Sequence, residues 1–215
     1  MVNIAKEGVS FVMAGFLIAA VGVAFANVTG IRAFHALTIV GVLAAVFCAY
    51  FFRNPERPHP TDRTKIYSPG DGRVLSVVQE PLHDGLTVRI FLSIFDVHFQ
   101  RSPYWGPVRE VTYVEGRFAL AMRLQANENE RNIVRIAAEG RPGEIVVEQI
   151  AGAIARRIRC WVDEGDPLEA GQRYGLIQFG SQVAVHLPVG AQPLVKPGDR
   201  VVGGITPIAL WTKGN

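Results

Sequence analysis

The stretch Leu86-Thr-Val-Arg-Ile-Phe-Leu92 is short and rich in β-branched and aromatic residues, which suit the pleated surface of a β-sheet. Six other runs share this character, and most of them are bounded by Gly, Pro, Asp or Asn. They are residues 73–78, 108–114, 133–136, 144–148, 156–162 and 183–187. Many short strands with turn residues between them predict a β-dominated sandwich or barrel, with one helix around residues 118–129.

Two turn motifs support this β architecture, Glu164-Gly-Asp-Pro-Leu-Glu-Ala-Gly171 and Lys196-Pro-Gly-Asp-Arg-Val-Val-Gly203. Gly and Asp adopt the special turn angles, and the valines enter the core. The second form is frequent in lipoyl-like and biotinyl-like hairpins, but no carrier lysine of the Lys-Met or Asp-Lys-Ala type accompanies it, which disfavours a swinging-arm carrier. We therefore predict a β-dominated α+β fold whose β domain is lipoyl-like, of the barrel-sandwich kind.

Toward the N-terminus the composition changes at about residue 52. No charged side chain lies between Glu7 and Arg32, or between Arg32 and Arg53, and nearly all of the charge follows. A chain of 215 residues is long enough for one domain with its own core and for additional elements. The sequence therefore predicts an apolar N-terminal piece, residues 1–52, and a β domain, residues 53–215.

The apolar piece contains two segments, residues 9–28 and 34–52, each close to the ~20 residues that a helix needs to cross a bilayer. Gly30 and its polar neighbours form a turn between them, so we favour a membrane-embedded helical hairpin. Lys6 and the small-x-small run Ala24-Phe-Ala26 also fit a signal peptide, but the second apolar segment argues against one. A helical pair in a soluble core would normally carry a polar face.

Basic residues flank both outer ends of this hairpin. The positive-inside rule then places both ends in the cytoplasm, at the inner face of a bacterial-type cell membrane, although Arg32 lies in the connection. Anionic membrane lipid is therefore an expected partner. The formal net charge of +3 does not suggest nucleic acid, which would favour clustered basic residues. The flanking residues are Lys6, Arg53, Arg57, Arg63 and Lys65.

Three residues with chemical potential are unremarkable when each is taken alone. The pair Gly180-Ser181, between two apolar runs, indicates only a turn. Asp71 followed by glycine is a strong turn pair. A single His98 near a strand end is usually a structural histidine. Their order along the chain, together with neighbouring motifs, is more informative.

Five motifs in this order resemble the phosphatidylserine decarboxylase family, and specifically its short form. The resemblance runs from about residue 50 to the C-terminus. Two departures stand out: Phe-Gly-Ser-Gln replaces the Leu-Gly-Ser-Thr of many members, and Arg101 replaces a second histidine that longer members place three residues after the one matched by His98. The motifs are Phe52-Arg-Asn-Pro55, Tyr67-Ser-Pro-Gly-Asp-Gly-Arg73, Phe91-Leu-Ser-Ile-Phe-Asp-Val-His-Phe-Gln-Arg-Ser-Pro103, Glu128-Asn-Glu-Arg131 and Gly175-Leu-Ile-Gln-Phe-Gly-Ser181.

The resemblance implies an enzyme that cuts itself between Gly180 and Ser181 into a β chain, residues 1–180, and an α chain, residues 181–215. A strand at residues 183–187 would keep the α chain docked after cleavage. Ser181 becomes a pyruvoyl group, whose ketone supplies the electron sink that decarboxylation of an amino acid needs and that side chains lack. A serine hydroxyl is a weak nucleophile, so its attack requires a base and an orienting group.

By the same resemblance, Asp71 orients or assists the base, and His98 activates Ser181, protonates Cα after carbon dioxide leaves, or does both. Arg101 and Arg131 either contact the substrate phosphate or lie on a solvated face. The implied reaction converts phosphatidylserine to phosphatidylethanolamine at the membrane surface. Two alternatives are a pyruvoyl decarboxylase of a soluble amino acid, which the hairpin disfavours, and a membrane-anchored lipoyl-like adaptor without catalysis.

The remaining histidines and the cysteines carry no expected chemistry. Cys48 and Cys160 form no metal-binding pattern, and Cys48 lies in an apolar run, so neither a metal site nor a disulfide is expected. The sequence leaves the oligomeric state open, including a homo-oligomer. The histidines expected to be structural or at the surface are His35, His59, His83 and His186.

Overall fold

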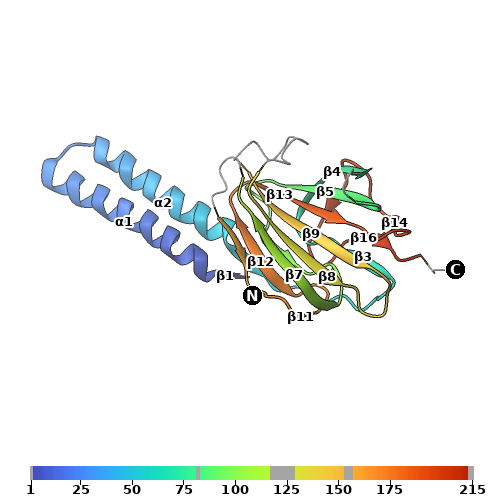
Figure 1. Cartoon of the computed structure of the whole chain (residues 1–215). Helices are drawn as coiled ribbons and strands as arrows, with labels where there is room; N and C mark the ends of the chain where they lie inside the picture. Colours follow the sequence, from blue (N-terminus) through green and yellow to red (C-terminus); the bar gives the residue numbers. More distant parts are fainter. Residues whose placement is uncertain (1, 81–82, 117–128, 153–156, 213–215) are drawn as a thin grey trace. The chain divides into compact units, whose positions relative to one another are not determined.

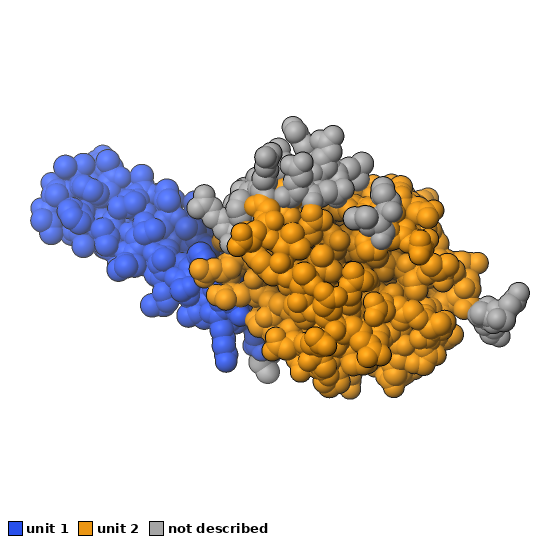
Figure 2. All heavy atoms as spheres, viewed as in Figure 1, with its two compact units in different colours: residues 1–56 blue, residues 57–215 orange. Residues whose placement is uncertain are grey.

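The computed structural model describes residues 2–80, 83–116, 129–152 and 157–212 (Figure 1). The chain divides into two compact units, Met1–Glu56 and Arg57–Asn215, which Figure 2 shows in different colours. The first unit contains the two helices and the predicted motif at residues 52–55, and the second contains the larger β-sheets and the other four motifs. The helix expected around residues 118–129 lies outside the described residues, apart from Asn129.

The first unit is a helical hairpin. Helix α1 (Lys6–Thr29) ends at Gly30, whose φ of 70° and hydrogen bond to the Ala26 carbonyl close the helix. Helix α2 (Ala33–Phe51) follows after a short turn, so the two predicted apolar segments are confirmed as helices. Strands β1 (Val2–Ile4) and β2 (Arg53–Pro55) pair antiparallel and join the outer ends of the hairpin. Both helices are long and apolar enough to cross a membrane.

Small residues form the contact between these two helices. A Cβ atom added to Gly15 would lie 2.7 Å from the Ala45 backbone nitrogen, so the backbones approach as closely as only glycine allows. Large apolar side chains point outward instead, and Leu17 and Leu43 are 66% and 62% exposed. A hairpin that buries glycine and alanine and exposes leucine has the arrangement of helices packed in lipid. The two helices thus suggest association with a membrane.

The second unit is built on an eight-stranded antiparallel sheet in the order β11-β7-β8-β9-β13-β5-β4-β15 (Figure 1). Six of the seven strands expected from the sequence lie in this sheet, and β5 has the predicted bounds. The β-dominated fold class is therefore confirmed. The strands are β4 (Gly72–Gln79), β5 (Leu86–Leu92), β7 (Gly106–Val114), β8 (Arg131–Ala137), β9 (Glu144–Ala151), β11 (Pro167–Leu168), β13 (Ser181–His186) and β15 (Arg200–Val201).

Two three-stranded sheets complete the unit. The seventh expected strand, residues 156–162, is shorter than predicted and belongs to the sheet β10-β12-β6, because Trp161 and Val162 leave the strand. The other small sheet has the order β14-β16-β3. The strands are β3 (Lys65–Tyr67), β6 (Phe99–Arg101), β10 (Arg157–Cys160), β12 (Arg173–Gln178), β14 (Gln192–Pro193) and β16 (Pro207–Leu210).

The large sheet has an apolar face and a polar face at its centre. Side chains alternate along a strand, and Val183 and Val185 of β13 enter the main hydrophobic core together with Val88 and Ile90 of β5. The alternate residues of β13, Gln182, Ala184 and His186, point to the opposite face and are buried there. Ser181 shares the face of Val183, so the predicted nucleophile lies on the core side of the sheet.

The two predicted turn motifs have the same local structure. The backbone nitrogen of Asp163 donates to the Asp166 carboxylate, and that of Lys196 donates to Asp199, both at 2.9 Å. The glycines that precede these aspartates have φ values of 93° and 95°, which favour glycine. The special angles predicted for the glycines are confirmed, whereas the aspartates act through their side chains. Of the two valines in the second motif, Val201 enters the core as predicted and Val202 is exposed.

Candidate active site

Ser181 is the first residue of β13 and is fully buried. It pairs with Leu92 of β5 on one side and with Ala151 of β9 on the other. Its hydroxyl makes no hydrogen bond to any described residue. A buried polar atom without a partner is costly in a folded protein and often marks a functional position. The predicted nucleophile is thus held rigidly by two strands while its reactive atom is unengaged.

The backbone immediately before the predicted cleavage site is strained. Phe179 has a φ of 63°, and it is the one non-glycine residue with a positive φ in the described part of the chain. This left-handed conformation costs an L-residue ~1–2 kcal/mol. Strained residues persist only where the surrounding structure enforces them, and they cluster at functional sites. Here the strain lies one residue before Gly180, the carbonyl of which Ser181 would attack.

His98 is brought to the same end of the sheet by two neighbouring connections. One runs from β5 to β6 through residues 93–98, and the other runs from β12 to β13 through residues 179–180. The backbone nitrogen of Ile177 donates to the His98 carbonyl at 3.3 Å. A Cβ atom added to Gly180 would lie 3.9 Å from Ile94. The cleavage turn and the histidine connection therefore lie side by side.

The hydrogen bond of the His98 ring indicates which nitrogen can act as a base. The side chain is fully buried, and its Nδ1 lies 3.0 Å from the Asp96 carbonyl oxygen. A carbonyl oxygen only accepts hydrogen bonds, so Nδ1 carries the proton. In the neutral ring Nε2 is then the basic nitrogen, which is the form that general-base catalysis requires.

The carboxylate of Asp71 is held by an arginine and a backbone amide. Arg57 donates to both carboxylate oxygens, at 2.6 and 2.8 Å, and the Gly203 nitrogen donates to Oδ1 at 2.8 Å. The turn that carries Asp71 abuts the strands next to His98, since the position of a Gly70 Cβ would be 3.3 Å from the Gln100 side chain. Asp71 is therefore fixed at the site's edge as half of a nearly buried ion pair.

The two arginines considered as phosphate ligands are engaged within the fold. Arg101 is buried, and its guanidinium donates to the Gly171 carbonyl at 2.8 Å while its backbone nitrogen donates to Pro69 at 2.8 Å. It thereby connects β6 to two turns at the position of the second family histidine. Arg131 lies 3.6 Å from Glu148, on the opposite side of the large sheet from Ser181.

Buried amides lie on the same face of the sheet as Ser181. Gln149 of β9 is opposite Val183 and is fully buried, and its Nε2 has no hydrogen-bond partner among the described residues. Its oxygen accepts from Asn132 at 3.0 Å, which fixes the amide. Gly175 leaves room for this amide, because a Cβ there would lie 2.6 Å from Nε2. The Nε2 group of Gln149 is thus a fixed hydrogen-bond donor in the interior of the domain.

Sequence reasoning missed several of these features. Arg57 was interpreted as a membrane-flanking charge, and no pattern linked it to Asp71. Gln149 lies in an ordinary strand pattern, and the conformation of Phe179 has no signature in the residue type. His35 and His59 are exposed, as expected for surface residues.

Comparison with known proteins agrees with these motifs. A family model described as phosphatidylserine decarboxylase matches residues 44–209. A protein of Syntrophus aciditrophicus named phosphatidylserine decarboxylase proenzyme is 39% identical over 215 residues, which is 97% of each chain. Proteins with the same name are 44% identical in Symbiobacterium thermophilum, over 95% of this chain and 94% of the relative, and 43% identical in Mycobacterium leprae, over 96% and 88%.

Proposed function

The chain belongs to the phosphatidylserine decarboxylase family, and we propose that it converts phosphatidylserine to phosphatidylethanolamine with a pyruvoyl group made from its own Ser181. The observation that carries the proposal is the buried, unengaged hydroxyl of Ser181 next to the strained turn at Phe179. The relatives are named proenzymes, which supports a processing step before activity.

Self-cleavage begins when the Ser181 hydroxyl attacks the Gly180 carbonyl. The peptide C–N bond breaks, and an ester to Oγ replaces it. Removal of the Ser181 Cα proton then breaks the Cβ–Oγ bond, which releases Gly180 as a carboxylate and leaves dehydroalanine. Water hydrolyses the dehydroalanine to the pyruvoyl group and ammonia. The products are a β chain, residues 1–180, and an α chain, residues 181–215.

His98 is the base in this scheme, and Asp71 supports the site. The Asp96 carbonyl keeps the Nδ1 proton in place, so Nε2 can accept the hydroxyl proton of Ser181. The same nitrogen can later return a proton to the substrate Cα. Asp71, held by Arg57, fixes the turn beside His98. This assigns Asp71 an orienting role through the turn.

The residues around Ser181 fit a pyruvoyl group. Strands β5 and β9 pair with β13 on both sides, so residue 181 stays in place when its link to Gly180 is lost. The pyruvoyl ketone supplies the electron sink for loss of carbon dioxide. The Gln149 amide donor lies on the same face and can bind an acceptor oxygen of the substrate.

We place the catalytic domain at the cytoplasmic face of the cell membrane. The lipid-like packing of the hairpin supports an anchor in the bilayer, and the basic residues at its outer ends support the cytoplasmic side. The anchor keeps the catalytic domain attached to the membrane that contains the lipid. The substrate would therefore be an aminophospholipid instead of a free amino acid.

The matching turn motifs support a lipoyl-like relationship for the β domain. An adaptor of that kind would have no use for the ordered motifs around Ser181, so the family match disfavours this alternative. We also propose that the β chain and the α chain stay associated after cleavage.

The test compares wild-type protein with Ser181→Ala and with Ser181→Thr in denaturing gels and by intact mass. We expect wild type to yield fragments 1–180 and 181–215, with a carbonyl reagent labelling the smaller one. Ser181→Ala should stay uncut, and Ser181→Thr should cut slowly because it keeps a hydroxyl. An uncut, unlabelled wild type that still consumes phosphatidylserine in vesicles would disprove the mechanism. A higher activity on free serine than on phosphatidylserine in vesicles would disprove the lipid substrate.

A further inference from the structure

Two histidines and a glutamate outside the active site form a compact group. The ligand atoms of His83, Glu148 and His186 all lie within 4.8 Å of one another. We propose that these three side chains bind a divalent transition-metal ion such as Zn²⁺. Both histidines were expected to be structural or at the surface, and no metal site was expected from the sequence. The imidazole nitrogens and the carboxylate are donor types that Zn²⁺ prefers.

The proposed site is separate from the active site. His186 is the last residue of β13 and Ser181 is the first, which places their Cα atoms about 16 Å apart at the usual rise of a strand. The alternation of side chains also puts the two residues on opposite faces of the sheet. The metal would therefore act on the structure of the domain, and the inference does not depend on the proposed decarboxylation.

The surroundings of His186 orient one ring nitrogen toward Glu148. The Nδ1 atom lies 2.8 Å from the Thr87 hydroxyl, and Nε2 lies 3.1 Å from Glu148 Oε1. When Nδ1–H donates to the Thr87 oxygen, the Nε2 lone pair faces the carboxylate. Metal-binding histidines usually have such a partner at their other nitrogen, because it fixes the tautomer and the ring.

In this tautomer the Nε2 lone pair of His186 and the Glu148 carboxylate repel each other unless a cation lies between them. Both side chains are nearly buried, so water screens them little. Tetrahedral Zn²⁺ with bonds of about 2.0–2.1 Å places neighbouring ligand atoms about 3.3–3.4 Å apart. The observed separation of 3.1 Å between Nε2 and Oε1 requires only a small adjustment to reach that distance.

Glu148 is held in position by its neighbours on the polar face. Arg131 lies 3.6 Å from its second oxygen, Oε2, so the first oxygen is the one turned toward His186. Arg89 of the same face is occupied by Glu80, with contacts of 2.5 and 2.7 Å, and by Gln182 at 3.0 Å. Arg131 therefore engages Oε2, while the partners of Arg89 keep its charge away from Glu148, so Oε1 is the oxygen available to a metal ion.

His83 supplies the third ligand from the segment before β5. Its ring stacks on His186 with the centroids 3.5 Å apart and the planes inclined by 21°. Parallel rings do not aim their lone pairs at one point, so His83 must turn out of the stack to bind. It is half-buried and lines a pocket of about 380 Å³, which gives the ring room to turn. Metal binding would thus replace the stacking of His83 on His186 by coordination of both rings to one ion.

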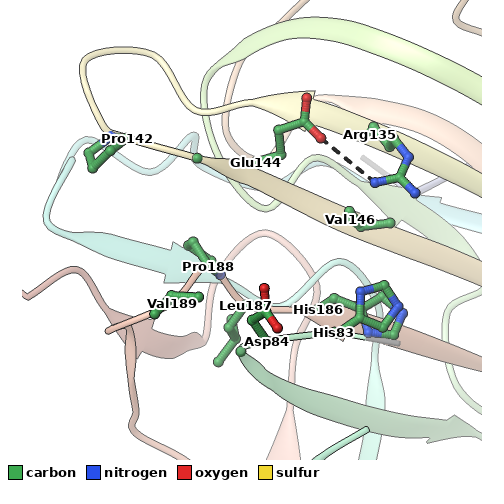
Figure 3. Close-up of a pocket in the computed structure, with 12 residues that line it drawn as sticks. His83, Asp84, Arg135, Pro142, Glu144, Val146, His186, Leu187, Pro188 and Val189 are labelled. Carbon is green, nitrogen blue, oxygen red and sulfur yellow. Dashed lines mark ion pairs between the residues drawn. The ribbon is translucent and has the colours of Figure 1, made fainter. Parts of the chain in front are cut away.

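The pocket also supplies a path from solvent to the site. Figure 3 shows the two imidazole rings at one end of this pocket and the Arg135–Glu144 ion pair across it. Asp84 lines the pocket as well, and its carboxylate favours entry of a cation, whereas the charge of Glu144 is paired with Arg135. A bound ion would connect the segment before β5 to β9 and β13. It would therefore fasten the C-terminal end of the strand that begins with Ser181.

The test measures Zn²⁺ binding to chelator-treated, tag-free full-length protein by calorimetry and by metal content. We expect one Zn²⁺ per chain and a higher melting temperature with Zn²⁺ than without it. His83→Ala should weaken binding by more than the roughly 10- to 100-fold that loss of a contact behind a ligand causes. His59→Ala is the matched control, because it removes an exposed histidine of the same unit and should leave binding unchanged.

Glu148→Gln provides a second measurement that keeps the side-chain shape and should also lose binding. Circular dichroism of each variant confirms that it is folded. Co²⁺ binding to wild type should give the visible absorption of a tetrahedral site, and the spectrum should be absent from His83→Ala. Equal Zn²⁺ affinity in wild type and His83→Ala would overturn the proposal.

Discussion

Substitutions of Phe179 test whether backbone strain before the proposed Gly180–Ser181 cut speeds self-cleavage. The Phe179 φ of 63° costs ~1–2 kcal/mol for a residue with a Cβ atom, whereas glycine adopts this conformation freely. If breaking the Gly180–Ser181 bond relaxes the strained turn, part of this energy lowers the barrier to self-cleavage. Phe179→Gly should then slow cleavage by at most about 5- to 30-fold, since 1.36 kcal/mol corresponds to tenfold in rate.

The control for this change is Phe179→Ala. Alanine removes the aromatic ring as glycine does, but it keeps the Cβ atom and therefore the strain. The comparison of glycine with alanine isolates the backbone, and the comparison of alanine with wild type measures the ring. The assay is a cell-free translation pulse followed by denaturing gels, in which the fragment of residues 181–215 is quantified against time.

Equal cleavage rates for the glycine and alanine variants would refute the reasoning. A glycine variant that is cut faster than alanine would refute it more strongly, because it would mean that strain hinders the attack of Ser181. A slower glycine variant with an unchanged melting temperature of the uncut precursor would show that the strain is not stored in the precursor. The reasoning requires glycine to be both slower and more stable.

Three further predictions concern the base, the Asp71 ion pair and an alkaline titration. His98→Ala should slow self-cleavage by about 10²- to 10⁴-fold in the same gel assay, and unchanged cleavage would exclude it as the base. Arg57→Ala leaves the nearly buried Asp71 charge without its arginine and should lower the free energy of unfolding, measured by chemical denaturation, by roughly 3 kcal/mol. Arg63→Ala, at an exposed pair, should lower it by only about 0–1 kcal/mol. Burial and the Glu130 hydrogen bond raise the pKa of Tyr113 to about 12, so its contribution to stability, present below pH 10, should be lost as the pH rises from 10 to 12. Ultraviolet titration of wild type and Tyr113→Phe measures this, and a Tyr113 signal near pH 10 would contradict it.

Local features of the fold were predictable because they depend on neighbouring residues. The bounds of β5 follow from a run rich in β-branched and aromatic residues between a glycine and a serine. The helices of the hairpin follow from uncharged stretches of membrane length. The strand at residues 156–162 was predicted too long, because β-rich composition does not reveal that Trp161 already leaves the sheet. Composition therefore located the strands better than it located their ends.

Features that depend on distant parts of the chain were not predictable. Arg57 has the same sequence setting as Arg63, yet one is nearly buried against Asp71 and the other is exposed. His83 and His186 meet only because β5 and β13 pair antiparallel in one particular register. The ordered motifs identified Ser181, His98 and Asp71 as candidates, but only the fold relates Asp71 to Gly203. Pair contacts of this kind require the strand register, which one sequence does not contain.

The position of the proposed cut in the sheet explains how one chain can lose a peptide bond and keep its structure. Ser181 is the first paired residue of β13, and all six residues of that strand pair with both β5 and β9. A cut before the strand therefore removes no pair from either ladder, whereas a cut within it would free an end in the middle of the sheet. Only the strained turn at Phe179 is released. We accordingly expect the 181–215 fragment to stay with the 1–180 fragment through purification in native buffer and to separate only on denaturation. Separation of the fragments in native buffer would mean that the two ladders do not hold the new end in place.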